Sequence, residues 1–489
     1  MKTNIVKFVF TLMIFSTAQS CSDFLDVEPE SVFTEIIVGG SESEGPKYKT
    51  KQEIEMLVSG IYTGLKSTAS EIYNLDLYML TDVRSDNAYS GSIEGWALSL
   101  DNFNVAPNNT LTAREWGIYY AMIGRANTII ENVDLVPDPA LTAELKKQYR
   151  AEASILRGMM YFDLVRYYGD VPLVLNDIPD ITSENIEEIY PLLYPKRAST
   201  NEVYQQIIAD LEFGAANGPA SSATGDKFKM TQAFAKGLLA KVYATAETKD
   251  WTKVRDYCNA VLAVGYSLLD DYEDLWSAGS QNTRESIFEI THSADAANWG
   301  YSMFLGANWQ KFSSPSHDLE EAFTAAGDNI RRNSSITQEA VSWSTFWPPN
   351  QCRFMYKIRN NISSFILLRA ADIMLLKAEA LIELNQISAA ADVIDEVRDR
   401  VNLPPLTAAN KSSQSAMRLA VELERRLELA FEGHRWFDLL RTGRAIDVMT
   451  NCKNAAGVKS YNVEEWMLLY PVPQSERDNN ENLTQNTGY

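Results

Sequence analysis

The chain has 489 residues, of which 45% are hydrophobic and 22% charged, and its formal net charge is −21 at pH 7. This composition can bury a large core and excludes a mainly disordered chain. The negative charge argues against nucleic acid and anionic lipid as partners, because cationic side chains must replace their counterions. We therefore expect one or two large, interlocked domains and no nucleic-acid partner.

The first twenty residues have the layout of a secretory signal. Lys2 and Lys7 flank the start of an apolar run, residues 8–15, and small or polar residues follow up to Cys21. The run is shorter than the roughly 20 apolar residues that span a bilayer, and no later segment reaches that length. We expect residues 1–20 to be removed and Cys21 to be lipidated. The alternative is plain secretion with a free Cys21.

The remaining cysteines, Cys258, Cys352 and Cys452, are few and widely spaced. They allow at most one disulfide and form no C-x-x-C pattern, so pairing among them stays open. Cys258 and Cys452 are expected to pack as small buried residues. The three histidines also lack a metal-ligand spacing. We expect neither a metal site nor a cofactor.

Apolar residues at three- and four-residue intervals predict a helical framework. Long helices are expected over residues 116–133 and 145–168, followed by helix-turn-helix units at 232–264 and 372–401. The second unit ends at Pro404-Pro405 and so has a length of about 34 residues, with alanines where two helices must approach closely, which is typical of the tetratricopeptide pattern. Prolines interrupt residues 169–200, which we interpret as a long ordered loop. Residues 271–350 are irregular, with one strand predicted at 286–291.

Residues 424–444 predict one helix that carries His434 and Trp436 among acidic and basic side chains. An acid–base site is one interpretation. Side chains on an apolar face and charge pairs at helical spacing, Glu422 with Arg426 and Asp438 with Arg441, are instead typical of a structural helix. We therefore expect His434 to have a structural role. The predicted apolar face comprises Leu423, Leu427, Ala430 or Phe431, and Phe437.

Six motifs follow one another along the chain from Cys21 to its last residues. Together they resemble the SusD/RagB family of surface glycan-binding lipoproteins, in the order in which that family has them. The motifs are Cys21-Ser22-Asp23-Phe24-Leu25-Asp26, Trp116-Gly117-Ile118-Tyr119-Tyr120, Tyr168-Gly169-Asp170-Val171-Pro172-Leu173, residues 425–439, Leu469-Tyr470-Pro471-Val472-Pro473-Gln474-Ser475-Glu476, and Leu483-Thr484-Gln485-Asn486.

The resemblance implies a mainly α fold, in which tetratricopeptide-like helix pairs form a scaffold packed against a loop-rich half with a few short strands. Residues 21–489 would form a single unit, with an N-terminal helical part at 21–270 and a C-terminal part at 271–489 that contains the loop-rich region 271–350 and helices over 366–446. It further implies a non-catalytic, lipid-anchored protein of the outer membrane, facing outwards. Its partners would be a glycan and a SusC-like TonB-dependent transporter.

Tryptophans mark the expected sugar site, because the C–H faces of sugars stack on flat rings while their hydroxyls need polar partners. Five of the ten tryptophans lie within residues 271–350. Trp96 follows a loop rich in Gly and Ser. For each single Trp the alternative is a ring buried in the loop-rich half. The predicted substrate-binding residues are Trp96, Trp299 and Trp309 as the best candidates, with Tyr301, Trp343, Trp347, Arg84 and Asn87.

Two other functions stay open from the sequence. The helical repeats could serve a peptide- or protein-binding scaffold lipoprotein of a nutrient importer. A surface glycosidase is supported only by the 65 acidic residues, because paired carboxylates need to meet only in space. The identity of the glycan is not encoded in any motif of this sequence.

Overall fold

The computed structural model describes residues 45–66, 71–177, 185–277, 279–344, 346–453, 457 and 461–489. The chain divides into two compact units, Met1–Gly45 with Ile178–Leu193, and Pro46–Asp177 with Tyr194–Tyr489. Helix α8 (Ile186–Leu193) belongs to the first unit, and the other described elements belong to the second. The predicted signal and Cys21 lie outside the described residues.

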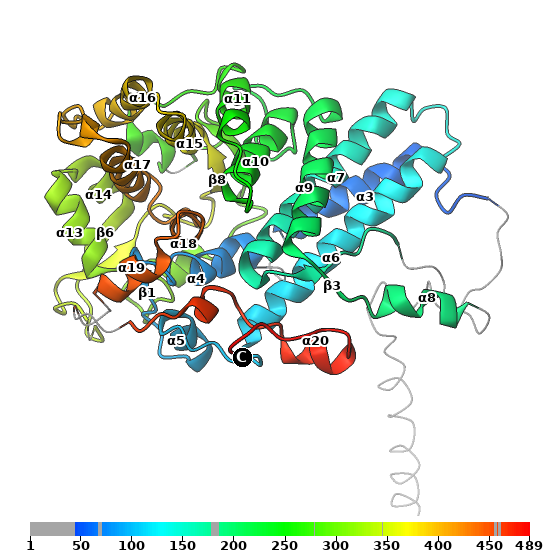
Figure 1. Cartoon of the computed structure of the whole chain (residues 1–489), viewed down its shortest axis with the longest axis horizontal. Helices are drawn as coiled ribbons and strands as arrows, with labels where there is room; N and C mark the ends of the chain where they lie inside the picture. Colours follow the sequence, from blue (N-terminus) through cyan, green and yellow to red (C-terminus); the bar gives the residue numbers. More distant parts are fainter. Residues whose placement is uncertain are drawn as a thin grey trace, which may run out of the picture. The chain divides into compact units, whose positions relative to one another are not determined.

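Four long helices of the second unit pack side by side (Figure 1). They are α3 (Lys51–Lys66), α6 (Thr110–Asn132), α7 (Ala143–Tyr168) and α9 (Thr200–Asn217). Side chains fix where three of them begin, because Asn109, Thr142 and Ser199 each accept hydrogen bonds from N–H groups of the first turn. Most residues of α7 are buried, so α7 is the central helix of this group. The helices predicted over 116–133 and 145–168 are confirmed.

The two predicted helix-turn-helix units are also confirmed. The first is α10 (Gln232–Thr245) with α11 (Trp251–Leu262), and the second is α15 (Ala370–Glu383) with α16 (Ile387–Asp399). α11 packs on α15, and α15 packs on α17 (Gln414–Glu428), so the pairs form a continuous stack. Small side chains such as Ala378, Ala390 and Ala391 are buried where α15 and α16 meet, which lets the helices approach closely.

The strands of the described residues are short and pair antiparallel in twos. The pairs are β1 (Ala88–Tyr89) with β5 (Ser314–Pro315), β2 (Val171–Pro172) with β3 (Arg197–Ala198), β4 (Ser286–Ile290) with β8 (Phe365–Arg369), and β6 (Ile336–Glu339) with β7 (Cys352–Met355). The predicted strand is therefore confirmed as β4. The main core joins residues of the long helices to residues of β4, β8 and the loops, so the loop-rich part packs on the scaffold as expected.

Several short helices complete the fold. Three α-helices of seven or more residues lie in segments predicted to lack helix: α8, α13 (His317–Ala326) and α14 (Asn329–Ser335). They are shorter than the helices that periodicity detects, and α8 contains Pro191. The others are α4 (Leu77–Leu80), α5 (Gly95–Asp101), α12 (Tyr301–Phe304), α18 (Arg435–Arg441), α19 (Ala445–Asn451), α20 (Gln474–Asn479), the π-helix η1 (Ile72–Asp76), and the 3₁₀ turns η2 (Val133–Leu135), η3 (Tyr272–Leu275), η4 (Asn410–Ser412) and η5 (Glu465–Leu468).

The single helix predicted over 424–444 is wrong, because the chain turns between α17 and α18. Phe431 and Gly433 have φ values of 59° and 76°, which no helix accommodates. A Cβ atom at Gly433 would lie 2.7–2.9 Å from side-chain atoms of Leu77, so this turn also packs closely on the scaffold. Of the predicted apolar face, Leu423 is 43% exposed.

The charge pairs of this segment also differ in part from the prediction. The Asp438–Arg441 pair is confirmed, with an N–O distance of 2.8 Å. Glu422 does not pair with Arg426. Arg426 instead pairs with Asp86 at 3.2 Å, while Glu422 pairs with Arg435 at 3.3 Å. The charged residues of this motif therefore form ion pairs with distant segments and do not pair along one helix surface.

His434 lies in the interior, as its structural role requires. Its Nδ1 atom is 3.2 Å from the Lys241 ammonium, and Asp372 lies nearby. Burial and the positive charge of Lys241 lower the pKa of His434 to about 4, so the ring is neutral at neutral pH. Its neighbours belong to α10 and α15, and the contact therefore joins the turn after α17 to both helix pairs.

Cys258, Cys352 and Cys452 are free and buried, so the described chain contains no disulfide among them. Burial raises the pKa of the Cys258 and Cys452 thiols, in line with their expected packing role. No described helix combines the length and apolar character that crossing a membrane requires. Within the same residues, His, Cys, Asp and Glu side chains form no group of three or more that could hold a metal ion.

Candidate binding surface

The loop that connects β4 to β5 carries three of the predicted ring residues, Trp299, Tyr301 and Trp309. Buried Asn298 fixes its first part, because its side-chain amide donates to the carbonyl oxygens of Asn360 and Ser363 at 3.2 and 2.8 Å. Its side-chain oxygen accepts a hydrogen bond from the backbone N–H of Tyr301 at 3.1 Å, at the start of α12. The ring-bearing loop is therefore held by defined contacts at its base.

Three rings from two segments form an aromatic cluster at this surface. Trp96 of α5 stacks on Phe312, with centroids 5.1 Å apart and planes inclined by 28°. Trp309 meets the same Phe312 edge to face at 5.6 Å. Trp96, Phe312 and Trp309 are all partly exposed. We call these three residues the aromatic cluster.

Lys311 supports the cluster from below. Its side chain is fully buried, and its ammonium lies 4.5 Å from the centroid of the Trp309 ring. The ammonium donates to the Ser302 carbonyl at 2.8 Å and to the Asn308 side-chain oxygen at 2.9 Å. Burial lowers the pKa of Lys311 to about 8. These contacts fix the Lys311 ammonium, which lies over the Trp309 ring.

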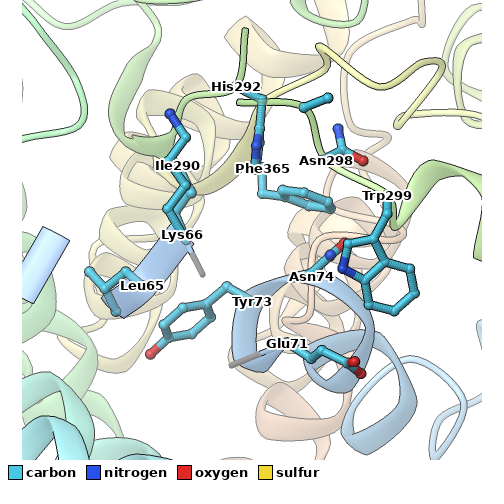
Figure 2. Close-up of a pocket in the computed structure, with 11 residues that line it drawn as sticks. Leu65, Lys66, Glu71, Tyr73, Asn74, Ile290, His292, Asn298, Trp299 and Phe365 are labelled. Carbon is cyan, nitrogen blue, oxygen red and sulfur yellow. The ribbon is translucent and has the colours of Figure 1, made fainter. Parts of the chain in front are cut away.

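Trp299 lines a small pocket on the other side of the same loop (Figure 2). Figure 2 shows its ring beside Asn74, with Glu71 below them and with Phe365 and His292 above. The enclosed volume is about 20 Å³, enough for a water molecule. Burial lowers the pKa of His292 to about 4, so this ring is neutral at neutral pH. The pocket is thus a small hollow with apolar and polar lining beside a partly exposed ring.

The floor of this pocket is the π-helix η1, a rare conformation that occurs often at functional sites. Its N-cap residue Glu71 has φ 35°, and the Glu71 carboxylate pairs with Arg114 at 2.8 Å. Arg114 also binds Asp76 at the other end of η1. Burial raises the pKa of Glu71, while Arg114 opposes the shift. Arg114 thereby clamps both ends of the pocket floor.

The remaining predicted tryptophans lie beside the cluster but are less available. Trp343 is partly buried and donates from its indole N–H to the Ala307 carbonyl at 2.9 Å, which supports the ring-bearing loop. Trp347 is only 8% exposed and packs against His317, at a centroid distance of 3.8 Å. Trp347 is therefore a core residue of this region. The alternative expected for each tryptophan, a ring buried in the loop-rich half, holds for this one.

Arg84 and Asn87 are buried and present no surface to a ligand. The Arg84 guanidinium lies 4.5 Å from the ring centroids of both Phe103 and Tyr470 and donates to the Met467 carbonyl. The side-chain oxygen of Asn87 accepts a hydrogen bond from Arg426 at 3.0 Å. Both residues hold C-terminal segments to the scaffold, which corrects their assignment as sugar contacts.

Some residues of this surface could not be predicted from the sequence. Phe312 joins Trp96 to Trp309, yet a lone Phe in an irregular segment carries no signal that separates it from a core residue. Phe346 is 37% exposed and packs on Tyr89. Asn74 meets Trp299 only because η1 and the loop before α12 approach closely, with the Asn74 side-chain oxygen lying where a Cβ atom of Gly300 would stand. These juxtapositions depend on tertiary structure alone.

This arrangement suits recognition of a ligand that has apolar faces and hydroxyl groups. Partly exposed rings offer stacking surfaces, and Asn74, Asn308 and Glu71 offer donors and acceptors nearby. The fold and this surface define a class of protein, a helical-repeat scaffold that presents aromatic side chains on ordered loops.

Family comparisons agree with that description. A model described as the SusD family matches residues 273–489, and one described as "Starch-binding associating with outer membrane" matches residues 23–244. The chain belongs to the SusD/RagB family.

Individual relatives are distant but cover nearly the whole chain. SusD-like protein P25 of Formosa agariphila is 23% identical over 550 residues, with 99% of both chains covered. A SusD superfamily protein of Parabacteroides distasonis has a TM-score of 0.76 at 22% identity, covering 91% of this chain and 100% of that one. A laminarin-binding SusD-like protein has a TM-score of 0.72 at 24% identity, covering 90% and 100%. These structures establish the mainly α fold.

Proposed function

We propose that this protein is a non-catalytic surface lipoprotein that binds an oligosaccharide and delivers it to a SusC-like TonB-dependent transporter of the outer membrane. The sugar stacks on Trp96, Trp309 and Trp299, and polar groups at the rim contact its hydroxyls. Tyr301 and Trp343 flank these rings and support the loop. The observation that carries this proposal is the stacked, partly exposed aromatic cluster held over buried Lys311.

Two further lines support a glycan as the cargo. The family model that matches the N-terminal half carries a starch-binding description, and one neighbour in fold is named for laminarin binding. Another neighbour is a surface glycan-binding protein of Bacteroides fluxus. A neutral glucan is therefore the first ligand to test. The anchor at Cys21, the outward orientation and the transporter partner rest on family membership and on the signal-like N-terminus.

Replacement of the three platform rings tests the proposal. The Trp96→Ala/Trp299→Ala/Trp309→Ala variant should bind glycan about a hundredfold more weakly than the wild type, because each lost stacking contact contributes about 0.5–1.5 kcal/mol. Isothermal titration calorimetry against a panel of neutral glucans, including laminarin oligosaccharides, measures the change. Near-ultraviolet circular dichroism checks that the fold is retained.

Trp466→Ala is the matched control, because Trp466 is also partly buried and packs on Tyr489, outside the aromatic cluster. This variant should bind with wild-type affinity. If the triple variant and the wild type bound glycan with equal affinity, these three tryptophans would not form the binding site. Binding of peptides, with no glycan of the panel bound by the wild type, would favour the scaffold function instead.

A further inference from the structure

A hollow in the helical scaffold shares no lining residue with the aromatic cluster. Its volume is about 490 Å³, within the roughly 300–1,000 Å³ of small-ligand sites. Residues from the start of α11, from α15, from α17 and from α18 line it. We call it the scaffold groove. The glycan-binding proposal makes no use of it.

One wall of the scaffold groove is apolar and contains an aromatic ring. Trp251, the first residue of α11, is partly exposed, and Leu419 and Val421 of α17 line the groove with it. Leu419 is 55% exposed, so its side chain is open to solvent at this wall. The groove therefore offers a flat ring and an aliphatic surface that are ready for a ligand with an apolar face.

Planar ion pairs form the polar rim and floor. Arg418 binds Glu383 through two hydrogen bonds of 2.6 Å, and Arg441 binds Glu379 through bonds of 2.5 and 2.7 Å. Arg444 pairs with Glu422 at 3.2 Å. Such fixed pairs present both donors and acceptors at defined positions, which suits the closely spaced hydroxyls of a sugar.

Lys249 differs from the other cationic residues of the groove. The groove is lined by five cationic residues and four carboxylates, in a chain whose net charge is −21. The arginines are paired, but the Lys249 ammonium has no carboxylate partner among the described residues and donates to the Arg441 carbonyl at the end of α18. It is exposed and lies two residues before Trp251. The unpaired charge among the residues that line this groove is thus positive.

We infer that the scaffold groove is a second ligand site, which takes an acidic sugar residue of an oligosaccharide. The C–H face of the sugar stacks on Trp251, and its carboxylate or sulfate group pairs with Lys249. This ligand fits the groove better than a protein segment does. A sugar can stack on the partly exposed ring, form hydrogen bonds with the planar polar side chains and pair with the unpaired ammonium. A protein segment would bury the paired charges and offer them few hydrogen bonds. The site goes beyond the proposed function, because it shares no residue with the aromatic cluster.

Binding measurements on the full-length protein in detergent solution test this site. The background is the Trp96→Ala/Trp299→Ala/Trp309→Ala variant, so that loss of the first site cannot be mistaken for loss of the second. The probes are glucuronate oligosaccharides, sulfated glucan oligosaccharides and neutral glucan oligosaccharides of equal length. We expect an acidic probe to bind at least about tenfold more tightly than the neutral one. The two acidic arms distinguish a carboxylate from a sulfate as the group bound.

Variants in the groove then assign the site. Lys249→Met should remove the preference for the acidic probe, and Trp251→Ala should weaken binding about tenfold, whereas Trp251→Phe keeps a ring and should retain most of the affinity. Lys147→Met, an exposed lysine of α7 outside the groove, is the matched control and should change nothing. Lys249 is exposed, so its variant should fold even if Trp251→Ala does not.

The inference is overturned if the acidic probes bind no better than the neutral probe, or if Lys249→Met binds them like the control. It is overturned equally if the groove variants lose only the interaction with a partner protein. Failure of the first site would appear separately, as unchanged neutral-glucan affinity in the triple ring variant.

Discussion

At the scale of the residue, Asp82 shows how far the interior shifts a single carboxyl group. Its side chain is fully buried, and one oxygen accepts a hydrogen bond from the Gly433 backbone N–H at 3.1 Å. The other oxygen has no hydrogen-bond partner among the described residues. Burial raises the pKa of Asp82 to about 7, and nearby Lys357 offsets only part of this effect. A protonated carboxyl fits this position better than an ionised one.

Asp82→Asn should make stability less dependent on pH. Because the folded-state pKa lies above the unfolded value, Asp82 contributes its full stability below about pH 4 and loses it as the pH rises towards 7. The variant should therefore match the wild type near pH 4 and exceed it by up to about 4 kcal/mol at pH 8. Urea unfolding at several pH values measures this. Parallel pH profiles for the two proteins would contradict an elevated pKa.

At the scale of the element, a buried ion cluster joins β8 to α17 and to the turn that follows. Arg369, the last residue of β8, pairs with Glu285, Glu428 and Glu432 at 2.6–2.8 Å. Arg369 and Glu428 have no exposed surface. Removing one partner of such a cluster leaves uncompensated buried charges. The loss should destabilise the packing of β8 against α17.

Arg369→Met should lower the free energy of unfolding by about 3–5 kcal/mol, or prevent folding altogether. Arg418→Met is the control: Arg418 also makes two hydrogen bonds to one carboxylate, Glu383, but its side chain is 49% exposed. Its removal should cost less than about 1 kcal/mol. Chemical denaturation measures both. Similar losses for the two variants would show that burial does not set the strength of these pairs.

The elements that sequence predicted well are those with long, regular periodicity, such as α7 and the pairs α10–α11 and α15–α16. The turn after α17 was missed because Phe431 adopts a positive φ that only its tertiary contacts stabilise, and no glycine marks that position. The site was predicted in part: Trp96 and Trp309 share the aromatic cluster, but Phe312, which links them, carries no sequence signal. Arg84 looked like a polar rim residue because burial cannot be read from neighbouring residues.

At the scale of the whole molecule, the proposed function requires a helical scaffold, a ring-bearing surface and a lipid anchor at Cys21. Cys21 lies outside the described residues. If Cys21 carries lipid, its acyl chains would attach the protein to the membrane.

Cys21→Ser should move the protein from the membrane fraction to the soluble fraction. Fractionation of cells that express either form, followed by immunoblotting, measures the change. Cys352→Ser is a useful control because that thiol is buried, so it should leave the distribution unchanged. Retention of the Cys21→Ser protein in the membrane fraction would exclude lipid at Cys21 as the anchor.

The central claim is that glycan stacks on particular rings, and the indole N–H signals of the ten tryptophans test it most directly. In a nuclear magnetic resonance titration with a neutral glucan from the panel, the signals of Trp96, Trp299 and Trp309, assigned through single Trp→Phe variants, should shift with a common affinity. Buried Trp116 and Trp436 should not move. Shifts confined to other tryptophans, or no shift with a glycan that binds, would contradict the account.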